Sequence, residues 1–291
     1  MRRGWYAAHM DASPFTSTPA PAMVVTDLDG TLLDSRGQLS AANRAVLERL
    51  GRDGVVRVVA TGRNLHSALR VMTPDVPIDY LVFASGVGTL EWSTRQLLHH
   101  HHLDDAAALD AAARLVSLGL DFMLHAGVPD NHRCWYHRAA PGNADFEHRL
   151  RRNQEFCVPW PDAAPAGPFS QLLAVQARGG ATGHDELAAL LDPLNVVRTT
   201  SPLDHESWWF EVFAPGVSKA AGAARVRDRH RLDPTRVLAV GNDYNDEALL
   251  AWAPQPRVVA NAPQSLRARF PEVPSNDEDG FAVAVNAWLA Y

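Results

Sequence analysis

The chain has 291 residues, enough for a sizeable core with an accessory domain. A hydrophobic content of 46% and a charged content of 21% are typical of a globular protein, and a net charge of -6 gives no electrostatic reason to expect nucleic acid or an anionic membrane as a partner. The two cysteines, Cys134 and Cys157, are too few for a disulfide framework, which favours reduced thiols in a cytoplasmic protein. We therefore expect a small solute as the partner, and nothing in the composition indicates an oligomeric state.

Residues 1–22 lack a pattern of secondary structure. They contain no apolar run long enough for a signal-peptide core or a membrane span, so no export is expected. The mixture of Ser, Thr, Pro and Ala just before Met23 cannot bury much apolar surface. We interpret residues 1–22 as a flexible N-terminal extension.

From residue 22 onward, short apolar runs alternate with helical patterns, which predicts an α/β fold with a mostly parallel sheet. The alternation occurs at both ends of the chain, so residues 23–86 and 205–291 form two halves of one predicted core domain. One helix is expected to begin after Ser40, a capping residue, and to end at Gly51. The strands are expected over residues 22–27, 55–63, 79–86, 236–243 and 256–263, and further helices over residues 245–253 and 280–290.

Residues 87–204 have a different texture, with hairpin-like strands and isolated helices, and their number suits a separate inserted α+β domain. Asp104 can cap an alanine-rich helix that Gly119 can end. The histidines at 99–102 would point to alternate faces of a strand, which favours a solvated hairpin edge over a metal site. Antiparallel strands are expected over residues 121–127, 133–138 and 170–177, and a second helix near residues 184–191.

The stretch VVTDLDGTLLDS, residues 24–35, ends a buried strand with two aspartates. Side-chain alternation places Asp27 and Asp29 on the same side, at the carboxyl edge of the sheet where ligands gather. Their mutual repulsion would be costly unless a cation or a shared proton relieved it, and a divalent metal would do so. Gly30 permits a tight turn whose backbone amides can approach an anion. A capped loop without a function is the alternative interpretation.

Two later segments supply groups that suit a phosphate. VVATGR places Thr61 and Gly62 directly after the second strand, where they could form a phosphate-binding corner. PGVSKAAGA places Lys219 at the start of a helix, where the helix dipole disfavours a cation unless an anion lies nearby. An exposed surface lysine is the alternative interpretation.

A last segment, LAVGNDYNDEALL, ends an apolar strand in oxygen-bearing side chains. Such hard ligands suit Mg²⁺ better than zinc, although a turn with a helix cap would use the same residue types. The side chains concerned are those of Asn242, Asp243, Asn245 and Asp246.

In this order, the four segments resemble the haloacid dehalogenase superfamily of phosphohydrolases, and within it the Cof-type branch with a large cap inserted after the third core strand. The resemblance runs from about Met23 to the C-terminus and includes the late stretches VANAPQSL and SNDEDGFAVAV. It implies a Rossmann-like core, an α+β cap domain and Mg²⁺ as cofactor. It also implies hydrolysis of small phosphorylated metabolites, with sugar phosphates as the favoured class.

By this resemblance, Asp27 is the nucleophile that forms an aspartyl-phosphate, and Asp29 is the general acid and base. Lys219 and the metal would offset charge in the transition state. The expected phosphate-binding residues are Thr61, Gly62, Lys219 and Asn245, and the expected metal ligands are Asp27, Asp29 through its backbone carbonyl, Asn242 and Asp246.

The chain departs from the family pattern at two positions. Asn242 stands where the family usually has Asp, so we expect a weaker metal site, with Asp243 left open as a compensating ligand. Ser85 and Gly86 stand where the family commonly has Asn-Gly, which predicts a different contact on the substrate side. A catalytically weakened phosphometabolite-binding or regulatory protein and a sugar-phosphate mutase are alternatives. The intact aspartate pair argues against the first, and the large inserted cap argues against the second.

Overall fold

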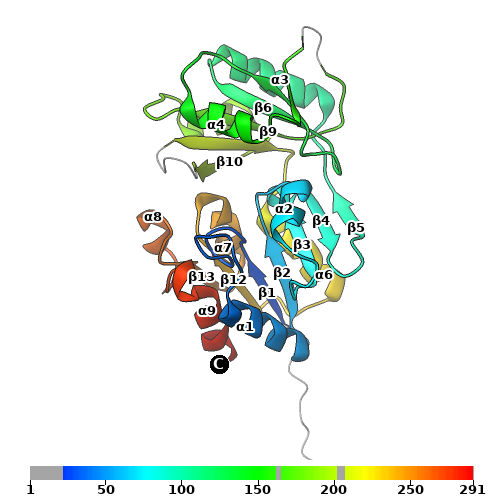
Figure 1. The fold of residues 1–291 in the computed structure, drawn as a ribbon, viewed down its shortest axis with the longest axis vertical. Coiled ribbons are helices and arrows are strands. Elements are labelled where there is room, and N and C mark those ends of the chain that lie inside the picture. The colour runs from blue at the N-terminus through cyan, green and yellow to red at the C-terminus, as the bar shows by residue number, and fades with distance from the viewer. Residues whose placement is uncertain (1–21, 162–164, 202–206, 291) are drawn as a thin grey trace, which may run out of the picture.

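Two β-sheets organise the molecule (Figure 1). The computed structural model describes residues 22–161, 165–201 and 207–290. Within these residues, the large sheet has the strand order β14-β13-β12-β1-β2-β3-β4-β5, and the small sheet has the order β10-β11-β9-β6-β7-β8. In Figure 1 the small sheet and its helices lie above the large sheet. The predicted α/β fold with a mostly parallel core sheet is confirmed.

The large sheet is buried on both faces, as expected of a parallel sheet. Its strands run parallel from β14 to β3, and β4 and β5 are antiparallel. All four residues of β1 are buried: Val24 packs in the same apolar cluster as α1 and α9, whereas Met23 and Val25 pack with α6 and α7 on the other face. The elements of this part are β1 (Met23–Thr26), α1 (Ala41–Arg52), β2 (Val56–Ala60), α2 (Leu65–Val71), β3 (Tyr80–Phe83), η1 (Ala84–Gly86), β4 (Gly88–Glu91), β5 (Leu97–His100), α6 (Lys219–His230), β12 (Val237–Gly241), η2 (Tyr244–Asp246), α7 (Glu247–Trp252), β13 (Gln255–Val259), α8 (Gln264–Arg267), β14 (Glu272–Val273), η3 (Asn276–Glu278) and α9 (Gly280–Leu289).

The small sheet is antiparallel except for the parallel pair β7 and β8. Helices α3 and α5 pack on one face, against Phe122 and Leu124, and α4 packs on the other, against Met123 and Leu173. Alternation along β6 therefore decides which helix each of its side chains meets. The elements are α3 (Asp105–Ser117), β6 (Asp121–Ala126), β7 (Cys134–His137), α4 (Ala144–Arg152), β8 (Cys157–Pro159), β9 (Phe169–Gln176), α5 (His184–Leu190), β10 (Asn195–Thr200) and β11 (Trp208–Phe213).

The structure differs from the sequence prediction at the end of α1. The helix does not end at Gly51 but continues to Arg52, and Gly54 then takes the left-handed conformation with φ +71°. Gly51 serves another purpose, because a Cβ atom there would lie 2.2 Å from a guanidinium nitrogen of Arg57. A glycine inside this helix leaves room for that side chain.

The boundary between the two sheets does not fall at residues 87 and 204, the predicted bounds of the inserted domain. The strands β4 and β5 extend the large sheet as far as His100, because β4 folds back antiparallel on β3, and β11 extends the small sheet as far as Phe213. The extension over residues 1–22 lies almost entirely outside the described residues. A division into core and cap domains stays a prediction.

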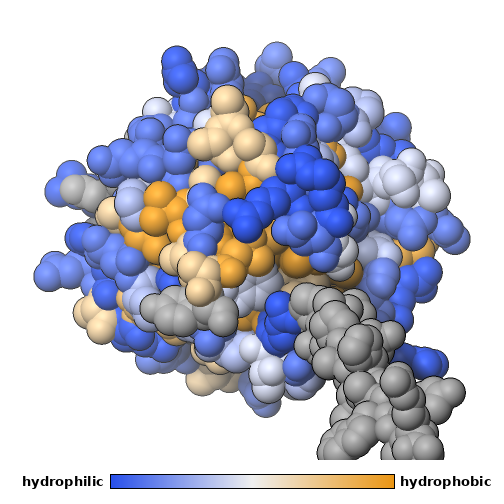
Figure 2. Space-filling model, turned by 90° about the horizontal axis from the view of Figure 1, so that it is seen from below, coloured by the Kyte–Doolittle hydropathy of each residue, from blue (hydrophilic) through white to orange (hydrophobic). Residues whose placement is uncertain are grey.

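Apolar residues gather at the centre of a largely polar surface at the lower end of the molecule (Figure 2). This end is opposite the small sheet. Among the described residues, no helix combines the length and the apolar character needed to cross a bilayer.

Candidate active site

The site begins where three parallel strands end together. Strand β1 lies between β12 and β2, and Thr26 is in register with Val240 on one side and Val59 on the other. The Asp27 amide then donates to the carbonyl of Val240 over 2.9 Å, so the chain is still held to β12 at this point. Segments distant in the sequence thus meet at one edge of the sheet, as parallel topology requires.

Lys219 is the centre of this edge. Its Nζ donates to Asp27 Oδ1 over 2.6 Å, to Asp246 Oδ1 over 2.6 Å and to Asn245 Oδ1 over 3.1 Å. Only 1% of Lys219 is exposed, with 5% of Asp27 and none of Asp246. The predicted conflict between a cation and a helix start is resolved by two carboxylates.

Lys219 is also the only lysine in the sequence. All the other residues among the 27 Lys and Arg are arginines. An ammonium is a compact point charge that can donate to three separate oxygens, whereas a guanidinium is a planar fork. The contacts of Lys219 need the ammonium geometry.

Asp246 fixes the loop that follows β12. Its Oδ2 accepts from the backbone amides of Asn242, over 2.8 Å, and Asp243, over 3.2 Å, while its Oδ1 accepts from Lys219. A Cβ atom at Gly241 would lie 2.6 Å from Asp246 Cβ, so this close approach requires glycine. Both oxygens of Asp246 are thus engaged in holding the site together.

The site carries an excess of buried negative charge. Burial raises the pKa of Asp27 to about 7, with further raising by Asp246 and Asp29 and an opposing effect of Lys219. Burial by itself would lower the pKa of Lys219, but the two carboxylates raise it above its ordinary value. One ammonium therefore faces two buried carboxylates, and a further cation would relieve the imbalance.

The donor set fits Mg²⁺, which takes hard oxygen ligands. Asn242 packs on the turn after β1, since a Cβ atom at Gly30, where φ is +71°, would lie 2.6 Å from its Nδ2. In the described ranges, no group of three or more His, Cys, Asp or Glu residues is arranged to hold a metal. A site here must therefore combine the Asp27 and Asp246 carboxylates with other oxygens. The predicted amide of Asn242 and backbone carbonyl of Asp29 are of that kind.

Asp243 is bound by Thr200 from the small sheet. Its Oδ1 accepts from the Thr200 hydroxyl over 2.9 Å, and its Oδ2 accepts from the Thr200 amide over 3.0 Å. Nearby, the guanidinium of Arg198 lies 3.6 Å from the centre of the Tyr244 ring. Asp243 thus joins the segment after β12 to the end of β10, and its role as a compensating metal ligand stays a prediction.

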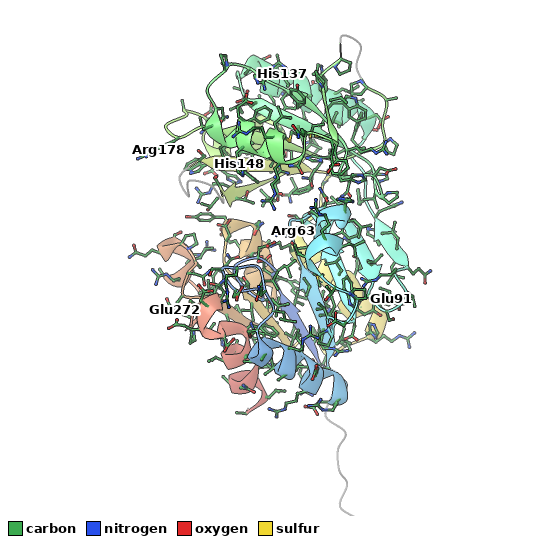
Figure 3. All side chains as sticks on the ribbon, in the orientation of Figure 1. Arg63, Glu91, His137, His148, Arg178 and Glu272 are labelled. Carbon is green, nitrogen blue, oxygen red and sulfur yellow. The ribbon has the colours of Figure 1, made fainter. Side chains whose placement is uncertain are left out.

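Asp29 forms a bidentate ion pair with Arg63, a residue that sequence reasoning did not select. Arg63 Nε donates to Asp29 Oδ2 over 2.7 Å, and one terminal nitrogen donates to Asp29 Oδ1 over 2.6 Å. Figure 3 shows Arg63 at the upper edge of the large-sheet part, below the small sheet. The sequence signal for Arg63 is its position at the end of ATGR, directly after Thr61 and Gly62.

Thr61 and Gly62 lie at the same edge. Thr61 is buried, and its Oγ1 accepts from the Arg63 amide over 3.1 Å. A Cβ atom at Gly62 would lie 3.4 Å from Asn245 Nδ2 and 3.5 Å from Ser85 Oγ. The absence of a side chain at Gly62 thus brings the backbone close to Asn245, the partner of Lys219.

Sequence reasoning also missed Glu211, which comes from the small sheet. Ser85 Oγ donates to Glu211 Oε2 over 2.9 Å, and both residues are buried. Burial raises the pKa of Glu211 above its ordinary value, against the effects of Ser85 and Lys219. Glu211 was not recognisable because its importance depends on a contact between residues 126 positions apart.

Comparison with known proteins places the chain in a family. The haloacid dehalogenase-like hydrolase family matches residues 24–285, so the chain belongs to this family. Phosphatase YwpJ from Bacillus subtilis is 25% identical over 281 residues, which cover 89% of this chain and 97% of YwpJ.

Solved structures show the same fold. BT1666 from Bacteroides thetaiotaomicron, one of the phosphatases of the haloalkanoate (HAD) enzyme superfamily, superimposes with a TM-score of 0.73 at 19% identity, covering 97% of this chain and 100% of BT1666. The HAD subclass IIB sugar phosphatase BT4131 gives a TM-score of 0.70 at 17% identity, over 93% of this chain and 100% of BT4131.

Proposed function

We propose that the protein is a Mg²⁺-dependent phosphatase that hydrolyses small phosphorylated metabolites, sugar phosphates above all, through an aspartyl-phosphate at Asp27. One observation carries the proposal: the buried Lys219 ammonium joins Asp27 to Asp246 at the carboxyl edge of the large sheet. The family membership and the sugar phosphatase among similar structures support the same chemistry.

In the first step, a carboxylate oxygen of Asp27 attacks phosphorus as the bond to the leaving oxygen breaks. Asp29, in its protonated form, gives its proton to that oxygen. In the second step, water attacks phosphorus, Asp29 takes its proton, and the bond between Asp27 and phosphorus breaks to release inorganic phosphate. Mg²⁺, when bound, supplies a positive charge that stabilises the phosphoryl oxygens.

The other residues of the site orient and neutralise the phosphoryl group. Lys219 offsets negative charge at the position where the transition state develops it. Thr61, Gly62 and Asn245 would donate hydrogen bonds to phosphoryl oxygens from the same edge. Arg63 holds Asp29 as a carboxylate through two parallel hydrogen bonds, a geometry that a lysine would not reproduce. The Asp29 oxygen that carries the acid proton in the first step must give up its bond to Arg63.

We further propose that the part built on the small sheet, from α3 to β11, acts as a cap domain inserted in a core built on the large sheet. Its bounds then differ from the predicted residues 87–204, because β4 and β5 stay with the core sheet and β11 joins the cap sheet. Two contacts between the small-sheet part and elements near the site support this proposal. Thr200 binds Asp243 after β12, and the His66 ring on α2 stacks 4.7 Å from the ring of His132. Closure over the substrate would exclude water from the reaction.

The test is release of nitrophenolate from p-nitrophenyl phosphate, with and without Mg²⁺. We expect Mg²⁺-dependent turnover that Asp27→Asn abolishes. Asp53→Asn is the matched control, because Asp53 lies at the end of α1 and its side chain is 49% exposed beside Arg49. A panel of sugar phosphates then tests the substrate class. Absence of turnover on every compound would favour a phosphometabolite-binding protein instead.

A further inference from the structure

The small sheet presents a row of buried polar side chains on one face. Glu211 is in register with Leu173, and Gln171 lies two residues before Leu173 on the same strand. Gln171 is in turn in register with His125. Because side chains alternate along a strand, Glu211, Gln171 and His125 share one face of the sheet. Their exposed fractions are 7%, 6% and 4%.

This row holds unused hydrogen-bonding capacity. Gln171 Oε1 and His125 Nε2 have no hydrogen-bond partner among the described residues, and neither does Nε of Arg149, which lies close enough to Glu211 to act on its charge. Buried polar atoms without partners cost free energy, so these atoms are available to bind water or the polar groups of a ligand. Acceptors and donors are both available in the row.

The row reaches the phosphoryl site at its Glu211 end. Glu211 accepts the hydrogen bond of Ser85, and its Oε1 would lie 3.7 Å from a Cβ atom at Gly62. Gly62 is also the neighbour of Asn245, which binds Lys219. The Glu211 carboxyl group is therefore separated from the phosphate-binding residues by little more than the Gly62 backbone.

The segment that carries Ser85 is strained in a way that preserves this contact. Ala84 and Ser85 are consecutive residues with φ of 47° and 51°, the left-handed region that residues other than glycine rarely adopt. Such strain persists only where the surrounding structure holds it, and it clusters at functional sites. Here it aims the Ser85 hydroxyl at Glu211.

We propose that Glu211, positioned by Ser85, selects substrates whose leaving group is uncharged and bears hydroxyl groups, and rejects phosphate esters whose leaving group carries a carboxylate or a second phosphate. This inference rests on the proposed phosphatase function and adds the residue that sets its selectivity. A carboxylate accepts hydrogen bonds from hydroxyl groups and repels a second anion beside it. Gln171 and His125 supply further hydrogen bonds to the same leaving group.

The experiment measures competition against p-nitrophenyl phosphate hydrolysis by two ligands, sorbitol 6-phosphate, which has an uncharged polyol, and 3-phosphoglycerate, which has a carboxylate. The selectivity is the ratio of their two inhibition constants. We expect the wild-type enzyme to favour sorbitol 6-phosphate. Glu211→Gln, which keeps the shape of the side chain and removes its charge, should lower this selectivity about tenfold. Ser85→Ala should lower it by less.

Glu147→Gln is the matched control, since Glu147 is also in the small-sheet part but pairs with Arg138 over 2.7 Å. It should leave the selectivity unchanged. A wild-type enzyme without preference for sorbitol 6-phosphate, or equal weakening of both ligands in Glu211→Gln, would overturn the inference while leaving the phosphatase intact. Ser85→Ala keeps the test valid if Glu211→Gln unfolds. Absence of any p-nitrophenyl phosphate hydrolysis would instead contradict the proposed function.

Discussion

Replacement of Lys219 by methionine removes the one charge that balances the two buried carboxylates. Methionine has a similar length and an apolar end, so the volume is largely retained while all three hydrogen bonds of Nζ are lost. The two charged partners of the ammonium, Asp27 and Asp246, are 5% and 0% exposed, so bulk water stabilises their charges only weakly once the ammonium is gone. The variant therefore isolates the electrostatic contribution of the cation.

The stability that Lys219→Met should lose follows from the cost of leaving a buried charge unpaired. This cost is about 3–5 kcal/mol when one member of a buried ion pair is removed. We expect the lower end of that range, because Asp27, with its pKa already raised to about 7, can take up a proton and relieve part of the repulsion. Mg²⁺ should restore part of the lost stability, since a divalent cation bound by the Asp27 and Asp246 carboxylates would replace part of the missing charge. Turnover should fall by about a thousandfold, as expected when one electrostatic contact to the transition state is lost.

The assay is urea unfolding of four proteins at pH 8, with and without Mg²⁺: the wild type, Lys219→Met, Asp27→Asn and the double variant. Because the two side chains are in contact, their effects should not be additive, and Lys219→Met should cost less in the Asp27→Asn background than in the wild type. Equal costs in both backgrounds, together with no effect of Mg²⁺ on Lys219→Met, would refute the reasoning.

Three further predictions concern other parts of the molecule. Asn242→Asp should lower the Mg²⁺ concentration for half-maximal activity about tenfold, because a carboxylate binds the cation more strongly than an amide; an unchanged Mg²⁺ dependence would exclude Asn242 as a ligand. Arg63→Ala should lower kcat about tenfold to a hundredfold, since Asp29 loses both hydrogen bonds that orient it, and Arg63→Lys should recover only part of the loss; wild-type kcat in Arg63→Ala would contradict this role. Burial lowers the pKa of His125 from 6.5 to about 3, so the unfolded chain binds a proton that the folded protein does not, and stability is lost as pH falls below about 6.5. The free energy of unfolding should therefore decrease by about 2 kcal/mol more between pH 8 and pH 5 in the wild type than in His125→Gln; parallel pH profiles would show that His125 is not the titrating group.

The sequence predicts those parts of the site that belong to strand ends. Asp27, Thr61 and Asn242 each follow an apolar run, and parallel topology brings the ends of such runs to one edge. Lys219 is recognisable for a similar local reason, because a cation at a helix start needs an anion. Periodicity and residue type placed these residues at one edge, whereas their roles were implied by the family resemblance.

Contacts between distant side chains were not predictable in the same way. Asp29 pairs with Arg63, and Ser85 pairs with Glu211. Both contacts depend on how separate segments pack together, and hydrophobic periodicity gives no information on that packing. Gly51 illustrates the same limit, because its value lies in the space left for a side chain of the neighbouring strand and not in a local turn. Helix ends follow local rules only where tertiary packing makes no other demand.

The most direct test of the account is chemical trapping of the covalent intermediate. Enzyme mixed with p-nitrophenyl phosphate and Mg²⁺ is quenched in acid and reduced with borohydride, which converts an acyl phosphate on aspartate to homoserine, and the peptide containing residues 24–35 is analysed by mass spectrometry. The account predicts homoserine at position 27, only when both substrate and Mg²⁺ are present. Homoserine at position 29 or at another aspartate, with none at 27 while turnover proceeds, would contradict it.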